Sequence, residues 1–323
     1  MNKPKDEPGL QTILSHCGRN LEASGGYVNV PPYEGSTILH DDMEDLFGRV
    51  DNHLYGDGTA QTYGTDGGPT HEAFYDAMNK LEGGAGTWAF STGLAGCTIP
   101  MMAFLKTGDH MLVTDSVYGP TRQFCEVLLK NFGVEAEFYE PTIGAGIEKL
   151  IRPNTRLIYM ESPGTHTFEM QDVPAIAAVA RKYNIVTMID NTYATPLNFQ
   201  PLKHGVDVVV HSATKYICGH SDVLMSTVTC NEKNWKQVRD VCKMTGQYAS
   251  AQSVYLGLRG LRTLKVRLDA VGVHTRKVVD WLLKREEVKK VIWPAYEKDP
   301  GYRIYKRDYS GPIGLFAFQF QDQ

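Results

Sequence analysis

The sequence predicts an α/β protein built on a mostly parallel central sheet. Short apolar runs rich in β-branched residues alternate along the chain with stretches that have the length and spacing of amphipathic helices. Strands that form continuous apolar runs are buried on both faces, and helical crossovers between them make them parallel. The predicted strands cover residues 87–90, 111–114, 156–160, 185–189 and 206–210.

Ahead of this pattern, residues 1–62 predict an arm rather than a domain. Their periodicity is weak and turn formers are frequent, among them Gly25-Gly26 and Pro31-Pro32. A segment of this kind cannot bury a core of its own, so we expect it to lie on another surface. Its polar start at residues 1–9 resembles neither a signal peptide nor a membrane span, and we therefore expect a cytoplasmic protein.

A large domain is predicted over residues 63–260. Its first helix covers residues 70–81, between Pro69 and Gly83-Gly84. This assignment follows from the preference of proline for the first turn of a helix and of glycine for the position just past its end.

A second, smaller α/β domain is predicted over residues 261–323. Apolar positions at helical spacing predict one long helix over residues 264–289, and strict alternation predicts a half-buried strand over residues 314–320. The chain stops directly after this strand. One terminal strand is a poor end for a domain, so we expect this domain to be truncated.

Composition narrows the functional classes. The chain has 323 residues, 42% hydrophobic and 22% charged, with a formal net charge of −4. Its charges are interspersed, so it lacks the basic stripe that nucleic acids or anionic membranes require. The six cysteines are scattered without C-x-x-C pairs or zinc-like spacing, which predicts reduced, mostly buried thiols and no metal site.

The most informative stretch follows the predicted strand 206–210 and reads His211-Ser212-Ala213-Thr214-Lys215-Tyr216. A lysine just beyond the carboxyl end of a buried parallel strand stands at the edge of the sheet where open α/β proteins bind ligands. Taken alone, such a lysine is more often a solvated loop residue. Ser212 and Thr214, however, place hydroxyls suited to a phosphate on either side of it.

A matching acid, Asp190, ends the preceding predicted strand, 185–189. Its distance along the chain lets both side chains emerge at the same edge of the sheet. A carboxylate there can bond the protonated ring nitrogen of pyridoxal 5'-phosphate (PLP), while Lys215 forms a Schiff base with the aldehyde. Asp190 alone could equally cap a turn, but the pair favours a PLP site.

Two further segments fit such a site. Ser91-Thr92-Gly93-Leu94 lies between the predicted strand 87–90 and a helix that runs to about residue 104, where free backbone N–H groups could bind a phosphate. Tyr118 follows the strand 111–114, and its ring could stack over a planar cofactor. A tyrosine at a strand end is, however, more often half-buried packing.

Together and in this order, these segments resemble the Cys/Met-metabolism family of PLP enzymes, which has the aminotransferase-like fold (fold type I). The resemblance runs from about Thr12 to the end of the chain. Its most specific part is the run of residues 212–216 followed by Gly219-His220-Ser221-Asp222. It implies PLP as cofactor and a small thioether amino acid as substrate.

The resemblance also implies a role for each candidate residue. Lys215 would bind PLP and act as the catalytic base, and Asp190 would pair with the pyridine nitrogen. Tyr118 would stack on the ring and could help to protonate the departing sulfur. The phosphate would be bound at two turns, by Gly93, Leu94, Ser212 and Thr214.

The run of residues 161–166, Glu-Ser-Pro-Gly-Thr-His, favours β-elimination. Relatives that act at the γ-carbon usually have asparagine where this chain has Thr165, whereas bacterial cystathionine β-lyases often lack it. The stretches 81–86 and 260–264 favour the same subgroup. The resemblance therefore implies a carbon–sulfur lyase that converts cystathionine to homocysteine, pyruvate and ammonia.

Three alternatives remain open at this point. The first is a γ-acting relative, such as a cystathionine γ-lyase, a cystathionine γ-synthase or a methionine γ-lyase. The second is a PLP-binding protein with a regulatory, non-catalytic role. The third, a nucleotide-binding protein that uses residues 81–86, is disfavoured because those glycines follow a helix instead of a strand.

The chain departs from the family at two places. The family has a Y-x-R motif whose tyrosine and arginine reach the phosphate site of a neighbouring subunit; here Tyr63 matches and Thr65 replaces the arginine. Loss of that charge-assisted contact would cost about 1.5 to 3 kcal/mol. The family also continues beyond residue 323 with an arginine that binds the substrate carboxylate. The Tyr63 match implies an obligate homo-oligomer, a homotetramer made of two dimers.

Overall fold

The computed structural model describes residues 9–56, 58–311 and 314–321. The first eight residues of the predicted arm and the terminal Gln323 lie outside these ranges. Within the described residues, no helix combines the length and the apolar character needed to cross a bilayer.

A seven-stranded sheet forms the centre of the molecule, in the order β1-β7-β6-β5-β4-β2-β3. Neighbouring strands are parallel except at β7, which runs antiparallel to both β1 and β6. The expectation of a mostly parallel sheet is therefore confirmed. The strands are β1 (Gly86–Phe90), β2 (His110–Thr114), β3 (Glu135–Tyr139), β4 (Thr155–Glu161), β5 (Val186–Asp190), β6 (Val208–His211) and β7 (Ser226–Cys230).

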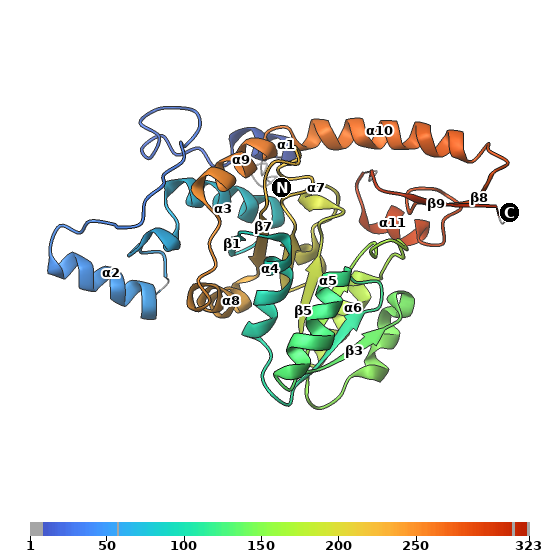
Figure 1. Ribbon diagram of the computed structural model, residues 1–323, viewed down its shortest axis with the longest axis horizontal. Coiled ribbons are helices and arrows are strands. Elements are labelled where there is room, and N and C mark those ends of the chain that lie inside the picture. The colour runs from blue at the N-terminus through green and yellow to red at the C-terminus, as the bar shows by residue number, and fades with distance from the viewer. Residues whose placement is uncertain (1–8, 57, 312–313, 322–323) are drawn as a thin grey trace, which may run out of the picture.

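Helices cover both faces of this sheet (Figure 1). Along β4, Leu157 and Tyr159 pack into one core, while Ile158 and Met160 pack into another on the opposite face. This alternation is what a strand buried on both sides requires. The helices of this domain are α3 (Pro69–Glu82), α4 (Gly93–Thr98), η2 (Ile99–Ala103), α5 (Gly119–Gln123), η3 (Phe124–Leu129), η4 (Pro141–Leu150), α6 (Val173–Lys182), α7 (Thr195–Asn198), η5 (Pro201–His204), α8 (Glu232–Met244) and α9 (Ala251–Leu261).

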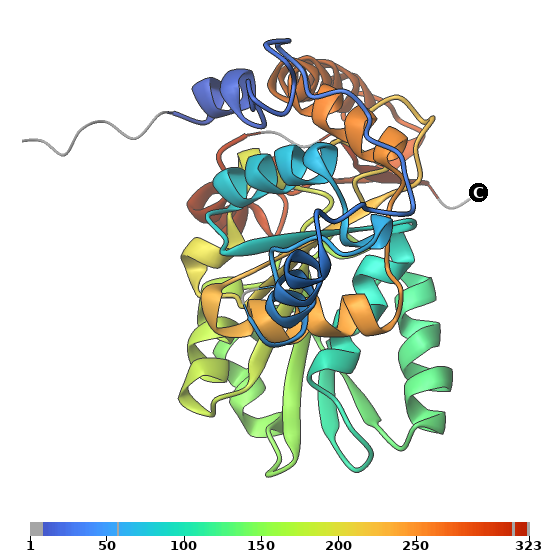
Figure 2. The same ribbon diagram turned by 90° about the vertical axis from the view of Figure 1, so that its left-hand side faces the viewer.

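The N-terminal part of the chain, up to residue 66, contains helices that were not predicted. These are α1 (Leu10–His16), α2 (Met43–Tyr55) and the short η1 (Gly64–Asp66). Helix α1 packs against α3, whereas α2 has no buried residue. Helix α2 stands away from the sheet in Figure 1 and faces the viewer in Figure 2.

The C-terminal segment begins with a long helix, α10 (Leu264–Leu282), which is shorter than the predicted 264–289. The last residues of that prediction instead enter strand β8 (Val288–Ile292), which pairs antiparallel with β9 (Ala317–Phe320). Helix α11 (Tyr302–Asp308) lies between these strands in the chain.

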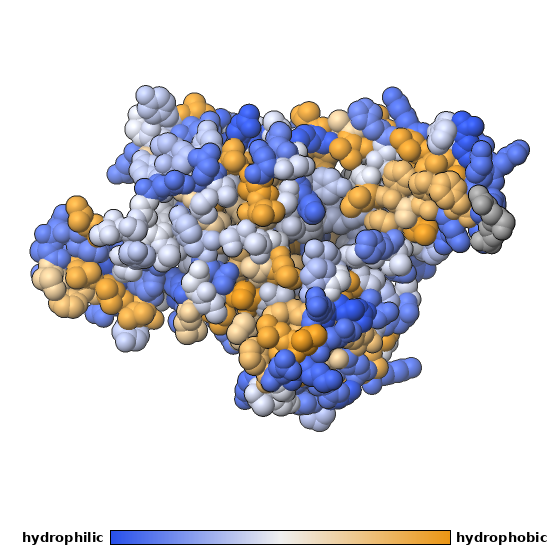
Figure 3. Space-filling model, viewed as in Figure 1, coloured by the Kyte–Doolittle hydropathy of each residue, from blue (hydrophilic) through white to orange (hydrophobic). Residues whose placement is uncertain are grey.

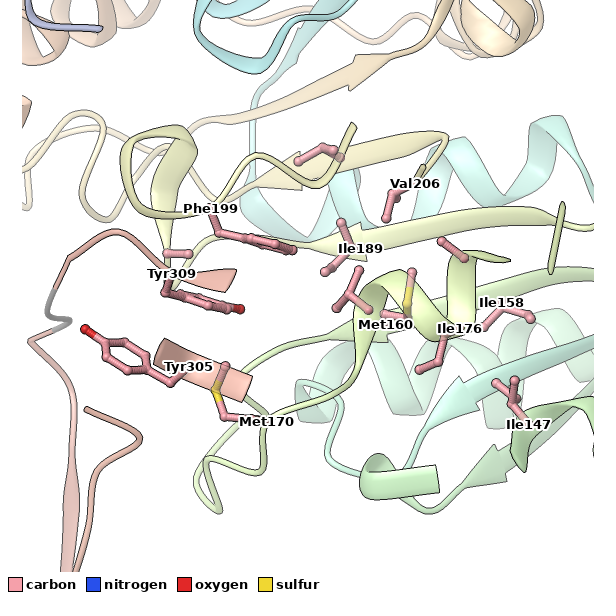
Figure 4. Packing of buried hydrophobic residues seen from close by; sticks show 14 of the residues in the cluster. Ile147, Ile158, Met160, Met170, Ile176, Ile189, Phe199, Val206, Tyr305 and Tyr309 are labelled. Atoms are coloured by element: carbon pink, nitrogen blue, oxygen red, sulfur yellow. The ribbon is translucent and has the colours of Figure 1, made fainter. Parts of the chain in front are cut away.

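An aromatic stack joins this segment to the large domain. The rings of Phe199 and Tyr309 stack with centroids 4.8 Å apart, and Tyr305 continues the stack (Figure 4). The Tyr309 hydroxyl also donates a hydrogen bond of 2.7 Å to the carbonyl of Ser162, just past the end of β4. The C-terminal segment thus packs against the carboxyl edge of the sheet, next to the end of β4.

Candidate active site

The carboxyl ends of β4 and β5 bring two acids together. These strands are parallel and in register, so Glu161 is the strand partner of Asp190. Both side chains are more than nine-tenths buried. The next strand, β6, ends at His211, and the predicted cofactor lysine, Lys215, lies in the turn that follows. The topology therefore gathers these residues at one edge, as the sequence predicted for Asp190 and Lys215.

Lys215 lies in a turn that is hydrogen-bonded to the turn after β5. Its backbone N–H bonds the Ser212 carbonyl at 3.0 Å, and the Ser212 N–H bonds the Thr192 hydroxyl at 2.7 Å. The lysine side chain is exposed. Across the part of the chain that the structure describes, its ammonium group makes no hydrogen bond or ion pair, so it is free to react.

The predicted phosphate-binding residues meet at the start of α4. Gly93 lies so close to Ser212 that a Cβ atom at position 93 would stand 2.5 Å from the Ser212 hydroxyl oxygen. Leu94 follows on the same turn. The Ser212 hydroxyl has no hydrogen-bond partner among the described residues, and it can therefore donate to a ligand.

Thr214 differs from Ser212 in this respect. Its hydroxyl donates to the Met225 carbonyl at 3.2 Å and accepts from the Met225 N–H at 2.9 Å. Its proton is thus used to hold the turn against the segment before β7. Ser212 is consequently the better placed of the two hydroxyls for binding a phosphate.

Asp190 accepts hydrogen bonds from two donors. The Thr192 N–H bonds Oδ1 at 2.9 Å, and the Cys97 thiol of α4 bonds Oδ2 at 3.5 Å. Burial raises the pKa of Cys97 well above its usual value, so the thiol keeps its proton and acts as a donor. All six cysteines are free and buried, which confirms the prediction for the thiols.

Tyr118 is attached to the same edge through Glu161. Its N–H donates to Glu161 Oε2 at 2.8 Å, and the Thr165 hydroxyl bonds Glu161 Oε1. The tyrosine side chain is 44% exposed at the start of α5. Burial first, and the charge of Asp190 second, raise the pKa of Glu161 to about 8.

Glu161 was not among the predicted site residues. A signal was available, because Glu161 ends its apolar strand as Asp190 ends the next one. What the sequence lacks is the register, which makes the two acids direct neighbours.

Tyr63 lies apart from this group, in the arm. Its backbone forms a bridge with Thr37, and its N–H bonds Asp66 Oδ2 at 3.1 Å. Thr65, which stands where the family has arginine, belongs to η1. Both positions are far along the chain from the Lys215 turn and join no hydrogen bond to it.

The residues present fit PLP. Asp190 is a buried carboxylate that, within the described ranges, has no ion pair with a lysine, arginine or histidine, and a buried carboxylate is costly without a cation. A protonated ring nitrogen would supply that cation. The unpaired amino group of Lys215 could bind the aldehyde of the cofactor. The turn where Gly93 closely approaches Ser212 could bind its phosphate.

Comparisons with known proteins agree with this geometry. Cystathionine beta-lyase MetC of Escherichia coli is 39% identical over 96% of this chain and 78% of its own length. An L-alanine/L-glutamate racemase of Wolbachia pipientis is 35% identical over 95% of this chain and 77% of its own. The crystal structure of cystathionine gamma-lyase from Lactobacillus plantarum complexed with L-serine superposes with a TM-score of 0.89. It is 29% identical and covers 97% of this chain and 79% of that one.

A family model provides the assignment. The model of the Cys/Met metabolism PLP-dependent enzymes matches residues 11–323, nearly the whole chain. This range includes the Lys215 turn, Asp190 and Glu161, and all the strands that position them. The chain therefore belongs to the family of Cys/Met-metabolism PLP-dependent enzymes.

Proposed function

We propose that this chain is a carbon–sulfur lyase that cleaves cystathionine by β-elimination to homocysteine, pyruvate and ammonia. The observation that carries the proposal is the unpaired ammonium group of Lys215 in the turn after β6, at the same carboxyl edge of the sheet as a buried acid pair at the ends of β4 and β5. The name of the Escherichia coli relative supports the substrate and the direction of cleavage.

Each residue at the edge has a proposed part in holding PLP. Lys215 would bind its aldehyde carbon, Asp190 its ring nitrogen, and Tyr118 would cover one face of the ring. When bound, PLP supplies an electron-withdrawing ring that takes up charge from Cα of the substrate. The phosphate would be held at two turns, those of Gly93, Leu94, Ser212 and Thr214, with the free Ser212 hydroxyl as a donor and Thr214 holding its turn against Met225.

The reaction requires one proton to leave Cα and one to reach sulfur. Lys215 is exposed and unpaired, so its amine is available to take the Cα proton as general base. The electrons of the Cβ–S bond leave with sulfur, which accepts a proton from Lys215 or from the half-exposed Tyr118. Water then releases pyruvate and ammonia from the remaining three-carbon fragment.

Product analysis tests this proposal. The purified protein is incubated with PLP and L-cystathionine, and the products are identified by mass spectrometry. We expect homocysteine and pyruvate, and a loss of at least about 10²- to 10⁴-fold in rate for Lys215→Ala, because the variant lacks the general base. A matched control is Lys203→Ala, which changes a lysine in η5, away from the site.

Other products would each contradict the proposal in a defined way. Cysteine with 2-oxobutyrate would assign the chain to the γ-acting relatives. Exchange of the Cα proton without cleavage of the C–S bond would favour a racemase. PLP binding with no product from any thioether amino acid would favour a non-catalytic role.

We also propose that the chain works as a homotetramer in which the arm contacts a neighbouring subunit. Four apolar residues of α2 are largely exposed, namely Met43, Phe47, Leu54 and Tyr55. Apolar side chains gather on this outlying helix in Figure 3. An exposed apolar helix of this kind favours an interface, which would bring Tyr63 to the phosphate site of the neighbour.

We further propose that the protein is located in the cytoplasm. The six free, buried cysteines support it, because thiols persist in reducing compartments.

A further inference from the structure

Glu161 connects the acid pair to the backbone that carries Tyr118. Oε2 accepts the Tyr118 N–H at 2.8 Å, and Oε1 bonds the Thr165 hydroxyl. Glu161 is also the register partner of Asp190 on the next strand. Glu161 is therefore the strand neighbour of the residue proposed to bind the ring nitrogen and the hydrogen-bond acceptor for the backbone of the residue proposed to cover the ring.

The turns around these residues are locked together. The Thr165 N–H donates to the Ser116 carbonyl at 2.8 Å. A Cβ atom at Gly164 would stand 2.2 Å from the Ser116 hydroxyl oxygen, so the two turns are in direct contact. A change at Glu161 would consequently be transmitted to Tyr118 and not be absorbed by a loose loop.

Two buried, adjacent carboxyl groups cannot both carry a charge at low cost. Among the described residues, neither has an ion-pair partner. Both oxygens of Asp190 face donors, a backbone N–H and a thiol. One oxygen of Glu161 accepts from a backbone N–H, that of Tyr118; the other bonds the Thr165 hydroxyl, which can accept a hydrogen bond as well as donate one. The geometry thus favours the extra proton on Glu161.

We propose that Glu161 is a positioning residue that, as a neutral carboxylic acid, fixes the backbone of Tyr118 and leaves Asp190 as the single negative charge facing the cofactor. This inference rests on the proposed PLP site. In this arrangement Oε1–H donates to Thr165 and Oε2 accepts from Tyr118, so every polar atom of the acid has a partner.

The groups that face Glu161 favour its protonated, neutral form. The titratable ones are Asp190 on β5, the Cys97 thiol on α4 and the Tyr159 phenol on β4, while hydrogen bonds from Thr165 and Tyr118 lower the pKa of Glu161 by less than burial raises it. The carboxylate of Asp190 disfavours a second charge, and burial holds the pKa of the Cys97 thiol and the Tyr159 phenol far above their usual values. No cation is among them. A pKa of about 8 for Glu161 follows from burial and from the charge of Asp190.

Three substitutions at position 161 test the inference. Glu161→Gln preserves the shape and the hydrogen bonds of a neutral acid, since its amide can donate to Thr165 and accept from Tyr118. Glu161→Asp is too short to reach both partners, and Glu161→Ala removes them. Glu140→Gln, an exposed glutamate at the start of η4, is the matched control.

The first readout is the affinity for PLP, measured from the visible absorbance that the protein gains as PLP is added. We expect Glu161→Gln to stay within about 3-fold of the wild type, and Glu161→Ala and Glu161→Asp to bind at least about 10-fold more weakly, because the Tyr118 N–H loses its acceptor and the backbone that carries the ring loosens. Equal affinities for all variants, or Glu161→Gln as weak as Glu161→Ala, would overturn the inference.

The second readout is the infrared carbonyl band of a protonated carboxyl group, followed between pH 6 and 9 with and without PLP. We expect a band at low pH in the wild type that fades as the pH rises and is absent from Glu161→Gln. Absence of this band from the wild type throughout that range would overturn the inference. If the wild type fails to bind PLP, the proposed function fails, and the band of the cofactor-free protein still decides the state of Glu161.

Discussion

At the scale of single residues, the buried acid pair dominates the electrostatics of the site. Asp190 and Glu161 are register partners at the carboxyl ends of β5 and β4, and no cation among the described residues neutralises them. Folding therefore confines negative charge in a place of low dielectric, which favours proton uptake. The same confinement makes the edge attractive to a protonated ring nitrogen.

This pair predicts a specific dependence of stability on pH. The pKa of Glu161 rises from 4.5 to about 8 on folding, so between these pH values the folded protein binds more protons than the unfolded chain. The free energy of unfolding of the wild type must then fall as the pH rises through that window. Glu161→Gln lacks this ionisation, so its advantage should grow from near zero at pH 4.5 to roughly 3 to 5 kcal/mol above pH 8.

Urea unfolding of cofactor-free protein at pH 5 and pH 9 measures this difference. Glu140→Gln should show no such change with pH, because Glu140 is exposed. A constant offset between the wild type and Glu161→Gln at both pH values would contradict the prediction.

Some of these site residues were predictable from the sequence and others were not. The positions of Lys215 and Asp190 were predictable because each follows an apolar strand, and parallel strands end at one edge. The pairing of Glu161 with Asp190 was not, because it depends on the exact register between β4 and β5, which strand patterns do not give. The engagement of the Thr214 hydroxyl by Met225 was hidden because it depends on how the chain turns back before β7, a strand that was not predicted.

At the scale of secondary structure, two strands of the central sheet escaped prediction for physical reasons. β3 is an edge strand that is mostly solvent-accessible, and its Glu135 and Glu137 pair with Arg152, so it lacks an apolar run. β7 is fully buried but rich in threonine and serine. These polar residues made the segment unlike a core strand in the sequence. In the structure such hydroxyls can be buried where they find partners; the Thr229 hydroxyl, for example, bonds the Thr87 hydroxyl of β1 at 2.7 Å.

Helix α10 supports the Lys215 turn through Arg267. Its guanidinium group donates to the carbonyls of Tyr216 at 2.6 Å and Gly260 at 2.8 Å. Partial burial lowers the pKa of this arginine from its usual value, which reflects how far the group is removed from water. The fork geometry of arginine allows it to bridge two carbonyls that belong to different segments.

We therefore expect Arg267→Lys to destabilise the protein by about 1 to 3 kcal/mol, although the charge is kept, because an ammonium group cannot reproduce the fork. The visible absorbance of bound PLP should decrease in parallel as the turn loosens. The control is Arg259→Lys, an exposed arginine of α9, expected to change stability by less than about 0.5 kcal/mol. Equal urea midpoints for the two variants would contradict this prediction.

At the scale of the whole molecule, contacts within a single chain do not explain why the arm contains helix α2. The large domain and the C-terminal segment are joined through the aromatic stack of Phe199 and Tyr309. Helix α2, in contrast, has a clear polar and apolar pattern but no buried residue. Sequence patterns predicted an arm but not α2, because a helix that buries nothing within its own chain depends on a partner surface for most of its stability.

A change at Phe47 tests whether this helix is an interface. Phe47 is 60% exposed, so Phe47→Glu costs little in the isolated subunit, whereas burial against a second copy would be worth about 1.5 to 3 kcal/mol. We expect the variant to dissociate in sedimentation analysis with a dissociation constant at least about 10-fold higher, while its urea midpoint changes little. PLP affinity should fall with dissociation, since Tyr63 of the neighbouring subunit would leave the site.

The matched control is Phe132→Glu, which alters a phenylalanine that is 52% exposed and lies after η3, outside the arm. Its assembly should remain that of the wild type. Dissociation of Phe132→Glu together with intact assembly of Phe47→Glu would move the interface away from α2. Phosphate binding would then have to rest on the residues of one chain, because Tyr63 would no longer have a neighbouring site to reach.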